Sequence, residues 1–246
     1  MDDRVVVVTG GSRGIGRAVA EALAKQGASV EICGRDAEAL DEVSKDWDKI
    51  NASVVDLCDE QVVESWVEAI GQRHGRIDGL VNNAGTLGPR AALDETDVEA
   101  FRRTLEINAT GSFMVLREAY RWLRASAQPV VINMSSSVGR RGRGQWGAYS
   151  ISKFAVEGLA EVAADELADD GGCVVTLNPG GTATGMRAEA YPDEDPATLP
   201  TPAKVADTVV LLLTGLGPDE NGQKYSSRSL FNVLEQWPSG AAIPSD

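Results

Sequence analysis

Short runs of β-branched residues alternate with longer amphipathic stretches along most of this chain. Short apolar runs between turn residues predict strands buried on both faces, and apolar residues at every third or fourth position predict helices packed on a sheet. Strands are predicted at Val5–Thr9, Ser29–Gly34, Ser53–Asp56, Ile77–Asn82, Val130–Met134 and Cys173–Asn178. Helices are predicted at Gly14–Gln26, Asp36–Asp46, Glu60–Arg73, Asp97–Ala125, Ala148–Leu167 and Lys204–Leu213. This alternation predicts an α/β fold, a doubly wound parallel sheet with helices on both faces.

The length favours one domain. A chain of 246 residues with 43% hydrophobic content can bury one large core, so we expect a single domain over residues 1–246. A Pro-rich acidic stretch, Met186–Pro202, follows the sixth predicted strand. Ligands of such sheets bind outside the carboxyl ends of the strands, so residues 186–202 are a candidate substrate lid.

Charge and cysteine usage limit the partners. A formal net charge of −14 argues against nucleic acid, because phosphate binding needs an excess of Lys and Arg. Cys33, Cys58 and Cys173 lack the paired spacing of a zinc site or a disulfide framework, so we expect free thiols in a reducing compartment and no metal. The chain runs from acidic Asp2 and Asp3 directly into a strand, without a basic or long apolar leader, which predicts a cytoplasmic protein with no membrane partner.

A glycine-rich segment joins the first strand to the first helix. It reads Thr9-Gly10-Gly11-Ser12-Arg13-Gly14-Ile15-Gly16. Gly10 permits a tight turn, Gly14 lets the backbone approach a pyrophosphate and Gly16 allows close helix packing, while the helix N-terminus offers free N–H groups. This context predicts a Rossmann-type dinucleotide site.

The end of the second strand indicates which dinucleotide binds. An acidic residue there would hydrogen-bond free ribose hydroxyls, but this chain has Cys33-Gly34-Arg35. Arg35 and Arg13 can hold a 2′-phosphate through charge-assisted hydrogen bonds, and Asp36 can serve as the N-cap of the next helix. We therefore predict NADP(H).

Three motifs together resemble the short-chain dehydrogenase/reductase family over nearly the whole chain. They are the glycine-rich segment, Asn82-Asn83-Ala84-Gly85 and Tyr149-Ser150-Ile151-Ser152-Lys153, in the family's order. The resemblance implies four catalytic residues: Asn108, Ser136, Tyr149 and Lys153. It also implies an adenine contact at Asp56, an adenosine-side segment at Asn83–Gly85 and a nicotinamide-side loop at Pro179–Thr184. The candidate cofactor-binding residues are then Thr9, Gly10, Ser12, Arg13, Gly14, Ile15, Gly16, Arg35, Asp56, Asn83, Ala84, Gly85, Tyr149, Lys153, Pro179, Gly180, Thr182 and Thr184.

The spacing of Tyr149 and Lys153 supports those roles independently. The two residues lie one helical turn apart and share a face. A nearby ammonium favours the phenolate, so Lys153 is expected to lower the pKa of Tyr149 and to hold the nicotinamide ribose. Tyr149 would give a proton to a carbonyl oxygen, or remove it in the reverse direction, and Ser136 would donate a hydrogen bond to that oxygen. His74, the only histidine, is expected in a solvated loop.

The substrate stays open at this stage. Arg140, Arg141 and Arg143 can receive a phosphate-bearing substrate such as a 3-oxoacyl thioester, helped by arginines at helical spacing, Arg117, Arg121 and Arg124. They can equally pair with acidic residues of a subunit interface, and a neutral ketone or sugar-like alcohol remains open.

Assembly and two other functions complete the expectations. The resemblance implies a homodimer or homotetramer, but the family's final Asp-Gly-Gly is replaced by Asn221-Gly222-Gln223, which puts that interface in doubt. One alternative is an NADP(H)-binding sensor or scaffold without turnover. Another is a sugar-nucleotide epimerase, which usually needs a longer C-terminal region than follows Thr184.

Overall fold

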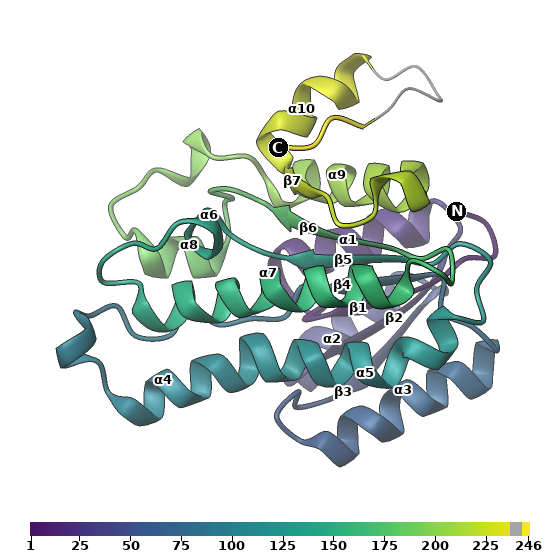
Figure 1. The fold of residues 1–246 in the computed structure, drawn as a ribbon, viewed down its shortest axis with the longest axis horizontal. Coiled ribbons are helices and arrows are strands. Elements are labelled where there is room, and N and C mark those ends of the chain that lie inside the picture. The colour runs from purple at the N-terminus through teal and green to yellow at the C-terminus, as the bar shows by residue number, and fades with distance from the viewer. Residues whose placement is uncertain (237–242) are drawn as a thin grey trace.

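A seven-stranded parallel sheet forms the centre of the molecule in the computed structural model (Figure 1). The structure describes residues 1–236 and 243–246. The strands are β1 (Val5–Thr9), β2 (Ser29–Gly34), β3 (Ile50–Val54), β4 (Gly79–Asn82), β5 (Val130–Met134), β6 (Cys173–Asn178) and β7 (Lys224–Ser226). Their order is β3-β2-β1-β4-β5-β6-β7, and all paired neighbours run parallel. The predicted doubly wound fold is confirmed, with its topological switch between β1 and β4.

Helices cover both faces of this sheet. They are α1 (Gly14–Lys25), α2 (Ala37–Lys45), α3 (Glu60–His74), α4 (Val98–Leu105), α5 (Gly111–Leu123), α6 (Ser137–Arg140), α7 (Gly147–Leu167), α8 (Gly185–Ala190), α9 (Pro202–Gly215) and α10 (Ser227–Gln236). Short 3-10 turns lie at η1 (Leu93–Glu95), η3 (Pro196–Thr198) and η4 (Pro218–Glu220), and a π-helical segment at η2 (Glu106–Thr110). Over residues 1–236 and 243–246, no helix has the length and apolar character to cross a membrane.

The two apolar cores follow from the alternation of side chains along β1. Val6 and Val8 pack in the core shared with α1, α2 and α9, whereas Val5 and Val7 pack in the core shared with α3, α5 and α7. All residues of β1 are buried, which explains the uninterrupted valine run. The carboxyl end of β1 is therefore packed between two helix layers.

Several predicted bounds were wrong: β4 begins at Gly79 rather than Ile77, α9 extends beyond Lys204–Leu213, and two other elements differ more. The third strand begins at Ile50, not Ser53, because Val30 to Gly34 of β2 pair with Ile50 to Val54. As an edge strand with a mixed polar sequence, β3 has only a weak apolar signal. The single helix predicted over Asp97–Ala125 is interrupted by η2, which divides it into α4 and α5.

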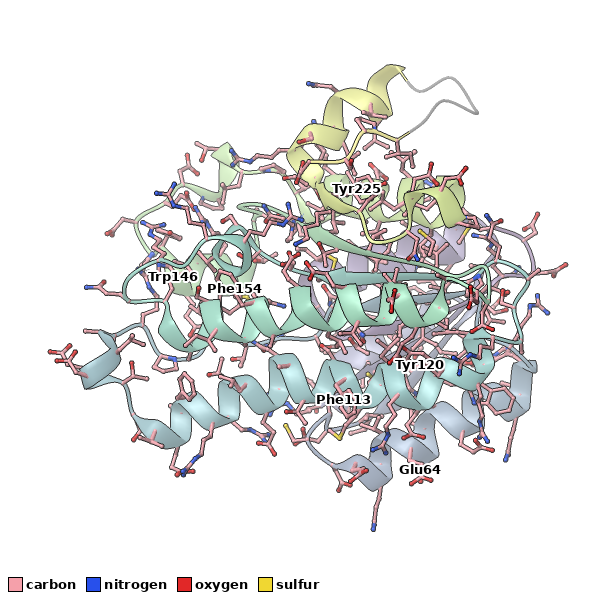
Figure 2. All side chains as sticks on the ribbon, in the orientation of Figure 1. Glu64, Phe113, Tyr120, Trp146, Phe154 and Tyr225 are labelled. Carbon is pink, nitrogen blue, oxygen red and sulfur yellow. The ribbon has the colours of Figure 1, made fainter. Side chains whose placement is uncertain are left out.

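The sequence prediction also missed elements near the C-terminal part of the sheet. The strand β7 pairs with β6 and buries Tyr225 completely (Figure 2). The turn before it is fixed by Asn221, which accepts from the Val174 N–H at 2.9 Å and donates to the Ala164 carbonyl at 2.8 Å. The sheet therefore continues to a seventh strand without the Asp-Gly-Gly ending. The stretch 186–202 contains most of α8 and the short turn η3.

Candidate active site

The glycine-rich segment forms the turn between β1 and α1, which we call the cradle. Gly10 and Gly14 have φ angles of +67° and +58°, which favour glycine. A Cβ on Gly16 would lie 2.2 Å from the Gly10 carbonyl oxygen, so a side chain there would force α1 away from the turn. Arg13 stands at the N-cap of α1 without a side-chain cap hydrogen bond, so the first N–H groups of α1 lack that side-chain acceptor. Two further segment residues, Ser12 and Ile15, pack inward.

Hydrogen bonds join this cradle to the end of β4. The Thr9 hydroxyl accepts from the N–H groups of Asn83 and Ala84, both at 3.0 Å, and the Asn83 side chain donates to the Thr9 carbonyl at 2.9 Å. Thr9 is only 1% exposed. Thr9 and Asn83 therefore hold the two strand ends together at the topological switch. Gly85, two residues after Asn83, packs closely on Asn108, since a Cβ on Gly85 would lie 3.2 Å from Asn108 Oδ1.

The end of β2 presents an exposed arginine beside the cradle. Arg35 follows Gly34 directly, and neither Arg35 nor Arg13 forms an ion pair with any residue that the structure describes. Asp36 caps α2 as expected, accepting from the Ala39 N–H at 3.1 Å. Asp36 is therefore occupied as a helix cap, and the guanidinium groups of Arg35 and Arg13 carry unpaired positive charge among the described residues.

Asp56 lies in the loop after β3. It accepts from the Cys58 N–H at 3.1 Å and from Arg103 at 3.3 Å. The Cys58 N–H, aided by Arg103, lowers the pKa of Asp56, so the carboxylate stays ionised. Arg103 lies on α4, and this contact joins the loop to the helix that leads to Asn108.

Ser136, Tyr149 and Lys153 come together beyond the end of β5. Ser136 is the N-cap of α6, and Tyr149 and Lys153 lie one turn apart in α7. Lys153 is 4% exposed; its Nζ donates to the Met134 carbonyl at 2.7 Å and lies 5.8 Å from the centre of the Tyr149 ring. The predicted catalytic side chains are therefore neighbours in the structure.

Burial controls the proton affinities of this pair. Removal of water raises the pKa of Tyr149 to about 12, an effect that the Ser136 hydroxyl offsets in part. Burial lowers the pKa of Lys153 to about 8, while the carboxylate of Glu157 acts in the opposite direction. The sequence predicts a lowered pKa for Tyr149, but here desolvation of the phenol outweighs the hydrogen bond from Ser136, so the net shift is upward.

Asn108 lies within the π-helical segment η2 and is fully buried. Its amide donates to the Thr86 carbonyl and to the Ser152 hydroxyl, both at 2.9 Å, and its oxygen accepts from the Thr86 N–H at 2.7 Å. The extra residue of a π-turn redirects side chains and often occurs at functional sites. Asn108 thereby joins the loop after β4 to α7 beside Lys153.

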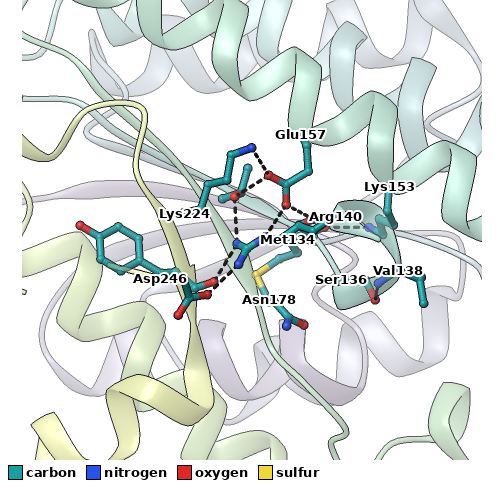
Figure 3. A network of polar contacts seen from close by, with 12 residues as sticks. Met134, Ser136, Val138, Arg140, Lys153, Glu157, Asn178, Lys224 and Asp246 are labelled. Carbon is teal, nitrogen blue, oxygen red and sulfur yellow. Dashed lines mark hydrogen bonds and ion pairs between the residues drawn. The ribbon is translucent and has the colours of Figure 1, made fainter. Parts of the chain in front are cut away.

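Glu157, which the sequence analysis did not single out, lies at the centre of a buried polar network behind Lys153 (Figure 3). It accepts from Ser135, from Thr176 at 3.0 Å and from Arg140 at 3.1 Å. It lies one helical turn after Lys153, and this spacing in the sequence could have identified it as a neighbour of the lysine.

Arg140 is occupied by this network. It binds Glu157 and, at 2.6 Å, the side chain of Asp246, and it also donates to the Tyr225 carbonyl at 3.0 Å (Figure 3). It thus fixes α6 against β7 and is not left to bind a phosphate-bearing substrate. The three helix arginines likewise pair with carboxylates of the same chain: Arg117 with Glu60, Arg121 with Glu68 and Arg124 with Asp170.

The loop after β6 returns to the phosphate cradle. It begins at Pro179; Gly180 has a φ of +72° and donates to the Asn178 side chain at 3.0 Å, and Thr182 is 3% exposed. Thr184 caps α8, and its Cγ2 would lie 3.6 Å from a Cβ on Gly14. The two loops therefore face each other across the carboxyl edge.

His74 was predicted to lie in a solvated loop, and this was wrong. It is the last residue of α3, and its Nε2 lies 2.7 Å from the buried carboxylate of Glu31. In β2, Glu31 stands between the apolar residues Val30 and Ile32, a pattern that predicts an exposed carboxylate. Nothing near His74 in the sequence therefore indicates its buried partner.

The comparisons with known proteins agree with this geometry. Residues 4–195 match the short chain dehydrogenase family. An uncharacterized oxidoreductase, YciK of Escherichia coli (strain K12), is 37% identical over 226 residues, covering 89% of this chain and 88% of that protein. Levodione reductase of Leifsonia aquatica is 33% identical over 215 residues, 85% of this chain and 79% of the reductase.

A solved structure of a short chain dehydrogenase has the same fold as this chain. A short chain dehydrogenase from Escherichia coli CFT073, complexed with NADPH, superimposes with a TM-score of 0.87 at 35% identity and covers 93% of this chain and 98% of its own. This superposition covers more of the chain than the matched family region, residues 4–195. This chain belongs to the short chain dehydrogenase family.

Proposed function

We propose that this protein is an NADP(H)-dependent oxidoreductase that interconverts a carbonyl and a secondary alcohol, with Tyr149 as the acid/base. The carrying observation is the grouping of Tyr149, Lys153 and Ser136 beyond β5, on the same edge of the sheet as the glycine cradle. Bound NADPH would supply the hydride that the carbonyl carbon receives. The chain's own residues provide binding, orientation and the proton.

The cradle suits a dinucleotide phosphate. Gly10 and Gly14 give the positive-φ turn that lets the backbone approach a pyrophosphate at the N-terminus of α1, and Gly16 lets this helix pack directly on the turn. Arg35 and Arg13 would hold the 2′-phosphate, since no described carboxylate neutralises either. The NADPH complex of the Escherichia coli CFT073 relative supports this assignment. Asp56, Asn83 to Gly85 and the loop Pro179 to Thr184 would line the rest of the cofactor.

Protonated Tyr149 suits the reducing direction. A phenol with a pKa of about 12 keeps its proton until negative charge develops on the substrate oxygen. Ser136 would donate a hydrogen bond to the same oxygen, and the Lys153 ammonium would stabilise the phenolate that remains. Asn108, through Ser152 and Thr86, would hold α7 at the correct distance from the cofactor loops.

Substrate and assembly are proposed at a coarser level. The 3-oxoacyl thioester proposal loses the support of Arg140, Arg117, Arg121 and Arg124, which pair within the chain. The name of levodione reductase favours a diketone. Residues 186–202 would act as the lid. We place the protein in the cytoplasm as a homodimer or homotetramer, with its described cysteines as free thiols.

The proposal is tested with purified protein and a panel of ketones, diketones and 3-oxoacyl thioesters, following loss of NADPH or NADH absorbance. Tyr149→Phe is expected to lower kcat by about 10²–10⁴-fold with little change in NADPH affinity, because only the proton donor is removed. Arg35→Asp should reverse the preference for NADPH over NADH. Tight NADPH binding without turnover on any carbonyl would favour the sensor alternative, and retained turnover in Tyr149→Phe would contradict the acid/base role.

A further inference from the structure

Two aromatic side chains belong to the same small apolar cluster as Tyr149. Trp146 directly precedes α7, is 6% exposed, and has its ring centre 6.0 Å from that of Tyr149. Tyr191 directly follows α8, with its ring centre 5.8 Å from that of Trp146. Figure 2 shows Trp146 where the start of α7 approaches α8. A substrate whose carbonyl reaches Tyr149 would therefore have its body against these rings.

Three arginines lie over the same rings. The guanidinium carbon of Arg90 is 4.6 Å from the centre of the Trp146 ring and 5.4 Å from that of Tyr191. Arg143 lies 5.8 Å from Trp146, and Arg187 lies 3.9 Å from Tyr191. Stacking on an aromatic face orders a guanidinium that would otherwise move freely in solvent. We call these five residues the arginine–aromatic cluster.

The arginines of the cluster differ in how their charge is balanced. Arg187 binds Glu194 through two hydrogen bonds of 2.5 and 2.6 Å. Arg90 and Arg143 form no ion pair with the residues that the structure describes, although the chain has 37 Asp and Glu against 23 Lys and Arg. Arg90 donates to the Ala190 carbonyl, and Arg143 donates to the Tyr191 hydroxyl at 2.9 Å. A guanidinium has five N–H donors, so each keeps further donors beyond these bonds to the described residues.

From this arrangement we infer that the substrate is an anionic carbonyl compound, with a carboxylate or phosphate bound by Arg90 and Arg143 while the carbonyl reaches Tyr149. The inference rests on the proposed oxidoreductase function. A planar guanidinium matches the geometry of either anion, and two ordered, unneutralised guanidiniums give a local positive field on an acidic protein. The aromatic rings between them and Tyr149 set the separation of anion and carbonyl.

Matched substrate pairs test the anion requirement. The pairs are para-acetylbenzoate and its methyl ester, oxocyclohexanecarboxylate and its methyl ester, and acetoacetyl-coenzyme A and the acetoacetyl N-acetylcysteamine thioester. We expect kcat/KM to favour the anionic member by about tenfold to a hundredfold, the range of charge-assisted hydrogen bonds. The first two pairs report a carboxylate and the third a phosphate. Equal turnover within every pair overturns the inference alone, whereas no turnover of any member contradicts the proposed function.

Variants locate the anion site. Arg143→Gln and Arg90→Gln should each reduce the anion-to-neutral ratio of kcat/KM by about tenfold, and Arg143→Lys should restore part of it because the charge returns without the planar fork. Arg102→Gln, a paired surface arginine on α4, is the charge-matched control and should keep the wild-type ratio. If Arg141→Gln reduces the ratio as much as Arg143→Gln, the effect is a general field and the assigned contacts are wrong.

Discussion

Individual side chains around Lys153 show how burial and charge compete. Burial lowers the pKa of Lys153 to about 8, and the neighbouring carboxylate of Glu157 limits that fall. Glu157 is itself held by Ser135, Thr176 and Arg140, so its position relative to Lys153 is fixed. The protonation of the proposed catalytic lysine therefore depends on a residue that touches neither cofactor nor substrate in the proposed arrangement.

Changing Glu157 to glutamine should move the pH profile of the reaction. For the wild type, we expect kcat/KM for reduction to be level at neutral pH and to fall as the pH rises through about 8, where Lys153 loses the proton that stabilises the Tyr149 phenolate. In Glu157→Gln the raising influence on the Lys153 pKa is lost, so the falling limb should move to lower pH. The measurement is kcat/KM against pH at saturating NADPH.

The control for this variant is Glu161→Gln, one turn further along α7, where a 61% exposed carboxylate pairs with Lys224. Its falling limb should stay at the wild-type pH. Loss of a partner for Arg140 will also destabilise Glu157→Gln, but a lower melting temperature does not by itself displace a pKa. An unmoved limb in Glu157→Gln would show that its charge does not act on Lys153.

Among the secondary-structure elements, those set by local sequence could be predicted and those set by distant partners could not. The apolar run of β1 and the glycines after it carry their own signal, and so does the Tyr149–Lys153 spacing in α7. The three-residue strand β7 depends on pairing with β6, and the buried partner of His74 comes from β2. Neither interaction leaves a pattern in its own segment.

The segment η2 is a further limit on prediction at this scale. Apolar residues recur at helical spacing on both sides of it, and a single inserted residue hardly changes that pattern. The insertion nevertheless alters which way Asn108 points. Its amide meets Thr86 and Ser152 because α4 and α5 are not one continuous α-helix.

Removing the Asn108 amide tests whether this segment positions α7. Asn108→Ala should lower kcat by about 10–100-fold through displacement of Tyr149 and Lys153. It should cost about 1–3 kcal/mol of stability, because the half-buried Thr86 backbone and the buried Ser152 hydroxyl lose a partner. Ser112→Ala is the matched control, since among the described residues its buried hydroxyl bonds only the Asn108 carbonyl, at 2.9 Å. Both are compared by kcat and by denaturant unfolding; equal kcat in the two variants would leave Asn108 with a structural role only.

Across the whole molecule, exposed apolar side chains gather on the face formed by α5 and α7. Phe113 on α5 is 46% exposed, and Ile151, Phe154 and Val162 on α7 are 42%, 46% and 58% exposed. Figure 2 shows Phe113 and Phe154 on these two adjacent helices. Ion pairs of Arg117 and Arg124 flank the same helices. An apolar centre with a charged rim is typical of an interface between subunits.

A charge placed at the centre of this face should separate the subunits. We expect the wild type to be a dimer or tetramer at micromolar concentration and Phe154→Glu to shift it toward monomer, because the carboxylate would be buried without a partner. Val54→Glu, at a 60% exposed position on the edge strand β3, adds the same charge elsewhere and should leave the assembly intact. Sedimentation velocity distinguishes the cases. Tyr149 and Lys153 also lie on α7. A monomeric Phe154→Glu with a lowered kcat but an unchanged melting temperature would therefore show that subunit contact orders the proposed catalytic helix. A wild type that sediments as a monomer would show that this face is not a subunit interface.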